Sequence, residues 1–479
     1  MKRLHVYTAR RIHTMDPGRP VADTVAIADG RVVSVGTLES LQPWLRRYPH
    51  DIDDTFANDI LLPGFIDPHT HLRLSGTFMG LNYVGPIPST DPRGRPVPML
   101  PDRDAVLARL KALVAGRNES PGSGAPAPIL AWGYDPGMQG GHLDRDMLDA
   151  ISKDVPIWVM CYAPHIIYTN TPMLARTGVT EDSGDLPMRM FLVPFEPTLR
   201  KRFGDDFLDF YRTMADKATE RLAVHGVKYV NDGSYPSMTL RLNFPGYLDG
   251  ETGLTGEVPW QSMVDRMLPF WKNGIQIHSH ANGDETVDMT LNTLNALQNA
   301  APRFDHRFTI EHYCISTPAQ ARRLAALGGL ASVNPYFVHY RSQIHADHGF
   351  GPDRAEATAR LGSLVRAGAT FALHSDYNLV VAPMHPLTAA WIAVNRVAAD
   401  GVTVMAPGER ISVEQALRAV TIDAAFVLRR DHCLGSIEAG KHADFAILEE
   451  DPFEVDPMHL RDIRIKGTIL AGEFHAAQR

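Results

Sequence analysis

Cysteine is scarce in this sequence, with three residues among 479: Cys161, Cys314 and Cys433. They lie far apart without a CxxC pair, and their number is odd, so a disulfide scaffold is excluded and a reducing compartment is the simpler expectation. The sequence also lacks a run of about 18 uncharged apolar residues, which excludes a membrane-spanning helix. Its first residues are basic but lack the apolar run of a signal peptide, which predicts a cytoplasmic protein.

Positive charge is not in excess either. Lys and Arg total 47 against 55 Asp and Glu, which gives a formal net charge of −8. A chain without a basic excess or a basic block cannot bind nucleic acid by neutralising phosphates. Hydrophobic residues make up 44% of the chain, enough to build a buried core. The 21 histidines are the first indication of what kind of enzyme this is.

Both ends of the chain carry short β-strand patterns. Near the start, Asp29 and Gly30 lie between two such patterns, and Asp-Gly is typical of a type I′ hairpin turn. Similar β-rich runs occur in the last 45 residues or so. We therefore predict that the termini meet in one small β-sandwich domain, built from residues 1–61 and 435–479.

The middle of the chain alternates apolar strand patterns with helical patterns. Eight strand candidates occur, over residues 61–66, 129–132, 157–160, 227–230, 275–277, 308–310, 330–333 and 370–373. Helix starts with capping-box residues follow Thr317 and Ser412. The alternation predicts an α/β fold, a (β/α)₈ TIM barrel over residues 62–434, with inserted loops around residues 73–128 and 178–212.

The strongest chemical signal is at residues 63–71 (PGFIDPHTH), where an apolar strand pattern runs into His-x-His. In a strand, residues i and i+2 point the same way, so His69 and His71 would present two imidazoles to one point. A divalent metal ion requires such an arrangement, and imidazole is its commonest ligand. Two surface histidines at a strand end are an equally weighted alternative.

Candidate ligands also follow other strand patterns: His278 and His280, His312, and Asp376. Each alone has an ordinary explanation as a hydrogen-bonded core or rim residue. Because barrel strands end on the same face, their convergence favours a shared metal centre. Lys228 lies inside an apolar strand, where desolvation and nearby cations disfavour an ammonium. It therefore either faces outward or is carbamylated by CO₂ into an anionic bridging ligand.

Together these motifs resemble the amidohydrolase superfamily, in particular its branch that contains the N-substituted formamide deformylases. The resemblance covers nearly the whole chain in the right order. The matching elements are residues 63–71, 227–228, 232–233, 280–284, 310–312, 375–376 and 435–444, with residues 133–135, His165 and Asn170 typical of the branch.

The resemblance implies a centre of two divalent metal ions. His69 and His71 would bind the buried α ion, carbamylated Lys228 would bridge the two ions, and His280 and His312 would hold the β ion. Zinc is the expected metal, with Fe²⁺ or Mn²⁺ as alternatives, and CO₂ is needed for the carbamate.

The resemblance also implies the catalytic groups. Asp376 would be both a ligand of the α ion and the proton shuttle, and His165 would contact the substrate and polarise its carbonyl. His278 stays the alternative to His280. Loop residues suggest a small, partly apolar substrate, although simple packing is the alternative for the aromatic ones. The substrate-binding candidates are Tyr134, Tyr162, Tyr336, His339 and His374.

The expected reaction is metal-dependent hydrolysis of a C–N bond other than a peptide bond, in an amide, an N-acyl amine, a cyclic amide or a carbamate. One alternative is a mononuclear deaminase or a non-hydrolytic lyase on the same barrel. Another is a catalytically silent structural subunit, which the presence of every expected ligand disfavours. The expected partner is a small molecule, without nucleic acid or membrane, and a homodimer is the candidate assembly.

Overall fold

The chain divides into two compact units. The computed structural model describes residues 3–70, 81–90, 96–116, 128–136, 138–161, 167–170, 189–220, 222–377 and 384–477. Unit 1 comprises residues 1–69, 187–374 and 385–477, and unit 2 comprises residues 70–186, 375–384 and 478–479. Three predicted site residues lie outside the described residues: His71, Tyr162 and His165.

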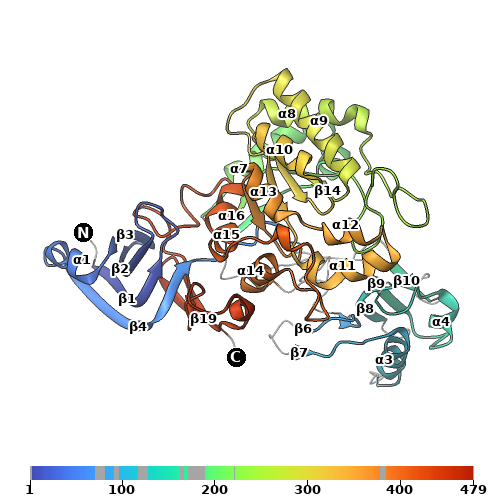
Figure 1. The fold of residues 1–479 in the computed structure, drawn as a ribbon, viewed down its shortest axis with the longest axis horizontal. Coiled ribbons are helices and arrows are strands. Elements are labelled where there is room, and N and C mark those ends of the chain that lie inside the picture. Colours follow the sequence, from blue (N-terminus) through green and yellow to red (C-terminus); the bar gives the residue numbers. More distant parts are fainter. Residues whose placement is uncertain are drawn as a thin grey trace. The chain divides into compact units, whose positions relative to one another are not determined.

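The two ends of the chain meet in one seven-stranded sheet of unit 1. Its strands, in spatial order, are β20 (Glu473–Ala476), β19 (Ile465–Leu470), β18 (Phe445–Leu448), β4 (His50–Pro63), β1 (Leu4–His13), β2 (Val21–Ala28) and β3 (Arg31–Gly36). The blue strands and the red β19 lie in the same part of Figure 1. Asp29 (φ 52°) and Gly30 (φ 73°) form the β2–β3 turn, as a type I′ hairpin requires. A β-sandwich with the boundaries given above stays a prediction.

One strand prediction was wrong. β4 ends at Pro63, so residues 61–63 belong to the terminal sheet and no barrel strand covers residues 61–66. Leu61 pairs with β1 on one side and with β18 on the other. A central strand that is buried on both faces reads as a continuous apolar run, whichever sheet contains it. The local pattern could therefore not distinguish the two sheets.

A five-stranded parallel sheet forms the centre of the rest of unit 1. Its strands follow one another in sequence order: β13 (Val227–Val230), β14 (Ile277–Ala281), β15 (Thr309–His312), β16 (Leu330–Val333) and β17 (Phe371–Leu373). Every neighbouring pair is parallel. Four of the five strands predicted in these places are confirmed, whereas the strand predicted over residues 275–277 begins at Ile277 and extends to Ala281. Because the strands are parallel, their carboxyl ends lie at one edge of the sheet.

Helices separate these strands, and α8, α9 and α10 lie around β14 in Figure 1. The α-helices of unit 1 are α1 (Leu38–Leu45), α6 (Glu196–Phe203), α7 (Phe207–Asp216), α8 (Trp260–Lys272), α9 (Asp284–Ala300), α10 (Pro318–Ala326), α11 (Tyr336–His348), α12 (Pro352–Glu356), α13 (Leu361–Ala367), α14 (Pro386–Asn395), α15 (Val413–Ala419) and α16 (Ile422–Val427). Shorter elements are β11 (Met190–Leu192), β12 (Leu222–Val224), η1 (Gly204–Asp206), η2 (Pro407–Glu409) and η3 (Pro457–Asp462).

The predicted capping box at the start of α10 is confirmed. The Thr317 hydroxyl accepts the backbone N–H of Gln320, and the Gln320 side chain accepts that of Thr317 at 2.8 Å. We expect Thr317→Ala to lower the free energy of unfolding by about 1 kcal/mol, because the backbone N–H of Gln320 loses the hydroxyl that accepts its hydrogen bond. Denaturant titration measures the change. Thr317→Ser, which keeps the hydroxyl, is the control, and an unchanged Thr317→Ala midpoint would contradict the expectation.

Unit 2 has a smaller sheet in the order β10 (Ile167–Thr169), β9 (Ile157–Cys161), β8 (Ile129–Tyr134) and β5 (Asn82–Tyr83). Strands β5, β8 and β9 are parallel, and β10 is antiparallel to β9. The unit also contains α3 (Arg103–Ala115), α4 (Arg145–Asp149), β6 (Ser89–Thr90) and β7 (Pro96–Val97). Val106 and Leu110 of α3 join Ile129 and Val159 in its hydrophobic core.

Parallel strands with intervening helices give the chain an α/β fold. The strands predicted over residues 129–132 and 157–160 are confirmed as β8 and β9. Closure of all the strands into an eight-stranded barrel stays a prediction. Within the described part of the chain, no helix has both the length and the hydrophobicity needed to cross a membrane.

Candidate metal centre

Four histidines of unit 1 gather with their rings close together. His69 follows β4, His280 lies in β14, His312 ends β15 and His374 follows β17. Ring centroids are 4.5 Å apart for His280–His312, 4.8 Å for His69–His312, 4.7 Å for His69–His374 and 5.1 Å for His312–His374. His280, His312 and His374 come from the carboxyl ends of parallel strands, whereas His69 lies beyond β4 of the terminal sheet and does not follow the barrel strand predicted before it.

Two candidate ligands have an unusual backbone. His312 and Asp376 adopt positive φ angles of 73° and 52°. Residues with a Cβ seldom do so, and the strain costs on the order of 1–3 kcal/mol. The side chains of neighbouring strand residues normally point to opposite faces of the sheet. Glu311 and His312 nevertheless both contact the ring of His69. The left-handed backbone at His312 breaks the alternation and allows this. Such strain is a feature of functional sites.

Asp376 is connected to this group through the chain. Only Ser375 separates it from His374, so the Cα atoms of His374 and Asp376 lie within about 7 Å of each other. Thr70 and Tyr377 directly follow His69 and Asp376, and these two residues form an isolated parallel bridge. The Asp376 side chain is buried, with 4% of the residue exposed. Chain connectivity therefore limits how far the Asp376 backbone can lie from that of His374.

The residues present fit a divalent metal ion. One ring nitrogen of His69 and one of His312 lie within 4.8 Å of each other, an upper limit above the separation of about 3.4 Å between two nitrogen ligands of one zinc ion. His312 and His374 are buried, with 4% and 1% of each residue exposed. Clustered imidazoles beside a carboxylate suit zinc, and they also suit iron or manganese. His71, the second residue of the His-x-His motif, lies outside the described residues.

Lys228 of β13 lies among these side chains. Its Nζ is 3.5 Å from Nδ1 of His69, so the outward-facing arrangement considered for this lysine does not hold. Glu311 is a charged neighbour of this lysine, and its carboxylate interacts electrostatically with both Lys228 and His69. The lysine is therefore in the right place for a role in the centre.

Glu311 is a residue that sequence reasoning missed. Its carboxylate accepts hydrogen bonds from Nδ1 of His69 at 2.8 Å and from Nδ1 of His278 at 2.6 Å. Burial raises the pKa of Glu311, but the charges of His69 and Lys228 and these hydrogen bonds outweigh burial and hold the pKa well below its usual range. Its position directly before His312, at a strand end, was the only signal in the sequence.

The orientation of His280 supports it over His278 as a ligand. Nε2 of His280 lies 3.0 Å from the Gly233 carbonyl and 3.2 Å from an Asp232 carboxylate oxygen, groups that only accept hydrogen bonds. Because polar groups of the protein surround Nε2, Nδ1 is the ring nitrogen that remains for a metal ion. The Asn282 amide, 2.8 Å from the same Nε2, donates to the Gly233 carbonyl. His278 instead contacts Glu311.

Three substrate-binding candidates use their polar atoms within the fold. The Tyr336 hydroxyl donates to the His385 carbonyl at 2.8 Å, and Nδ1 of His339 donates to the Val397 carbonyl at 2.7 Å. Burial lowers the pKa of His339 and raises the pKa of Tyr134 in unit 2 to about 12. A role of these residues in substrate binding stays a prediction, whereas His374 lies in the histidine group itself.

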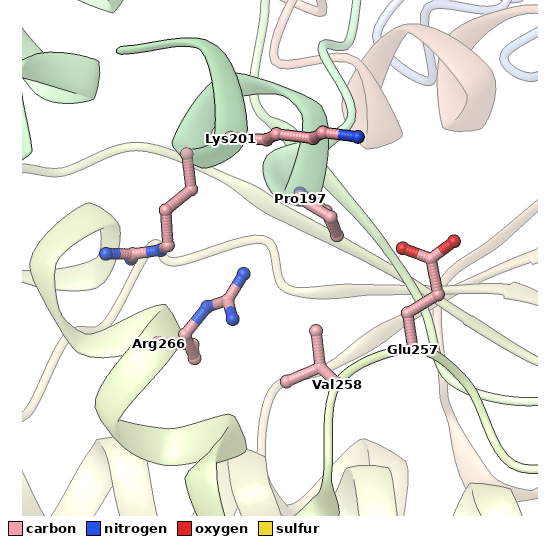
Figure 2. Close-up of a pocket in the computed structure, with 6 residues that line it drawn as sticks. Pro197, Lys201, Glu257, Val258 and Arg266 are labelled. Carbon is pink, nitrogen blue, oxygen red and sulfur yellow. The ribbon is translucent and has the colours of Figure 1, made fainter. Parts of the chain in front are cut away.

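A cavity of about 310 Å³ in unit 1 involves none of these residues. It is lined by Pro197, Arg200, Lys201, Glu257, Val258 and Arg266. Figure 2 shows Lys201 and Arg266 on opposite sides of this cavity. Arg200 and Arg266 both donate to the carboxylate of Glu196, whose side chain is fully buried. This shared ion pair holds α6 against α8, so the arginines have a structural role.

The family model of the amidohydrolase family matches residues 196–476. The chain belongs to the amidohydrolase family. The match includes β13 to β17 and the candidate ligands from Lys228 to Asp376. Membership of the amidohydrolase family supports a hydrolase that acts on C–N bonds and uses a divalent metal ion.

Individual relatives of this amidohydrolase agree with the family match. The chain is 27% identical to the protein LONG AFTER FAR-RED 3 of Arabidopsis thaliana, over 92% of this chain and 86% of that protein. It is 29% identical to the N-substituted formamide deformylase of Arthrobacter pascens, over 42% of this chain and 36% of the deformylase. An uncharacterized metal-dependent hydrolase from Pyrococcus horikoshii OT3 has the same fold, with a TM-score of 0.71 and 19% identity. The match covers 95% of this chain and 99% of that chain.

Proposed function

We propose that this amidohydrolase hydrolyses a C–N bond other than a peptide bond in a small, partly apolar molecule. The observation that carries the proposal is the convergence of His69, His280, His312 and His374 at strand ends, with Asp376 two residues beyond the last. Amides, N-acyl amines, cyclic amides and carbamates are the candidate substrates. The similarity to an N-substituted formamide deformylase supports N-acyl amines among them.

The proposed centre uses His69, His71, His280, His312 and Asp376 as ligands of two divalent ions, with carbamylated Lys228 between them. Zinc is the expected metal, and Fe²⁺ or Mn²⁺ are the alternatives. Bound there, the metal lowers the pKa of water toward neutrality and polarises a carbonyl group. The buried position of His312 strengthens the electrostatic interactions of the site, because little water reaches this ligand to screen them.

Asp376 carries out the proton transfers in this proposal. Its carboxylate accepts a proton from the attacking water and then delivers it to the departing nitrogen. His165 is proposed to donate a hydrogen bond to the substrate carbonyl, where negative charge develops. His374, whose ring lies 4.7 Å from that of His69, is proposed to contact the substrate.

One observation favours a centre with a single ion, as in a mononuclear deaminase or a non-hydrolytic lyase. The buried carboxylate of Glu311 interacts with Lys228 and compensates an ammonium there without carbamylation. A carbamate at Lys228 would instead place a second negative charge beside Glu311, and a second metal ion would have to balance it. The number of bound ions therefore distinguishes the two centres.

Metal analysis combined with a hydrolysis screen tests the proposal. The purified chain would be stripped of metal, then supplied with zinc and bicarbonate, and assayed for amine release from N-acyl amines, cyclic amides and carbamates. We expect about two ions per chain and a bicarbonate-dependent activity. One ion per chain with no effect of bicarbonate would support the mononuclear centre. A metal-loaded chain that hydrolyses none of these substrates would contradict the proposed hydrolysis.

A further inference from the structure

Glu311 is at the centre of a buried group of polar side chains beside the histidines. Only 1% of the residue is exposed, and it lies opposite His280 in the register of β14 and β15. From there its two oxygens reach two different imidazoles: Oε2 is 2.8 Å from Nδ1 of His69, and Oε1 is 2.6 Å from Nδ1 of His278. One carboxylate thus bridges a candidate metal ligand and a second histidine.

We propose that Glu311 is a positioning residue of the metal centre, which fixes His69 in the tautomer and orientation needed to bind the ion through Nε2. The inference rests on the proposed function, because it assumes that His69 is a ligand. A carboxylate only accepts hydrogen bonds, so Nδ1 of His69 must carry the proton and Nε2 the lone pair. The hydrogen bond also makes the imidazole a stronger ligand, as outer carboxylates do for metal-bound histidines.

His278 anchors the other end of the same carboxylate. It is 1% exposed, and among the described residues its Nε2 has no hydrogen-bond partner, so its one polar contact is the bond to Glu311. Its ring also packs edge-on against His225, with centroids 5.7 Å apart. Because His278 holds Oε1, the carboxylate cannot rotate away from His69. Sequence reasoning considered His278 a ligand, but its contacts give it a supporting role.

The Glu311→Gln variant changes this arrangement with little change in shape. The glutamine amide has one acceptor oxygen, and its NH₂ group only donates, so it cannot accept from both imidazoles. At least one of the two histidines must then switch its tautomer or turn its ring. If His69 is the histidine that changes, its Nε2 is lost as a ligand of the ion.

Zinc affinity of the full-length chain, measured by competition with a chelator, tests the inference without an activity assay. We expect Glu311→Gln to bind zinc about 10- to 100-fold more weakly than the wild type, and to change the visible spectrum of the cobalt-loaded protein. Glu409→Gln is the matched control. Glu409 is also buried, at 4% exposed, but its carboxylate accepts from Ser363 away from the centre. Glu409→Gln should therefore keep the zinc affinity and the cobalt spectrum of the wild type.

A folded Glu311→Gln chain with wild-type zinc affinity and an unchanged cobalt spectrum would overturn the inference. If that variant does not fold, Glu311→Asp replaces it, because its shorter side chain keeps the charge but cannot reach both imidazoles. Unchanged affinity in Glu311→Asp would likewise overturn the inference. A wild-type chain that binds zinc but hydrolyses no substrate would contradict only the proposed function. A wild-type chain that binds no divalent ion would overturn both.

Discussion

Asp376→Asn is expected to lower kcat by about 10²- to 10⁴-fold, because the variant lacks the carboxylate that we propose moves protons between water and the departing nitrogen. Asparagine has nearly the same size as aspartate but cannot take up a proton near neutral pH. Its side-chain oxygen remains a metal ligand, so zinc should stay bound. Steady-state kinetics on a substrate from the hydrolysis screen, with metal analysis of the same preparation, would measure both quantities.

Asp400→Asn is a suitable control for this variant. Asp400 caps an exposed turn through the backbone N–H groups of Val402 and Thr403, outside the histidine group. Its replacement should leave kcat unchanged. Wild-type kcat in Asp376→Asn would show that another group transfers the proton. Loss of zinc together with activity would show that Asp376 acts mainly as a ligand.

Zinc is expected to stabilise the folded chain strongly. The candidate ligands converge only when β14, β15 and β17 are assembled, so the unfolded chain should bind the ion far more weakly. At a free zinc concentration about 1,000 times Kd, binding adds about 4 kcal/mol to the free energy of unfolding. Thermal unfolding over a zinc series, from chelator to excess metal, should show Tm rising with the logarithm of free zinc.

A pair of histidine variants tests whether this stabilisation arises at the proposed centre. His312→Asn should remove most of the dependence of Tm on zinc, because the buried imidazole at the end of β15 is lost. His459→Asn should keep the dependence of Tm on zinc, since the side chain of His459 is 72% exposed and lies outside the histidine group. A zinc-dependent Tm that survives in His312→Asn would place the zinc site elsewhere.

The features that were predictable from sequence are those with a local signal. Five consecutive strands, β13 to β17, were recognised because buried parallel strands are short apolar runs between helical patterns. The turn at Asp29 and the cap at Thr317 depend on residues next to each other in the chain. The expectation that His280 and His312 lie close together followed from one geometric rule, that parallel strands end on the same side. His69 was expected there for the wrong reason, because it follows β4 of the terminal sheet and not a strand of the parallel sheet.

The features that were missed depend on partners far away in the sequence. Glu311 can position His69 only because His69 and His278 contact its carboxylate from other segments of the chain. The residues next to Glu311 in the sequence do not indicate these contacts. The end of β4 depends on its pairing with β18. Tyr336 and His339 look like loop residues in the sequence, but they lie in α11 and bond to distant carbonyls.

The pairing of β4 with β18 has a consequence for biosynthesis. β1, β2 and β3 can associate with β4 as soon as these four strands have been synthesised, but β18 is made only after all the residues between Pro63 and Phe445. Until then, the edge of β4 that carries Ile60, Leu61 and Leu62 has no strand beside it. An open apolar edge of this kind invites pairing between nascent chains. Ribosome-bound or truncated forms that stop before Phe445 should therefore need chaperones more than the finished protein does.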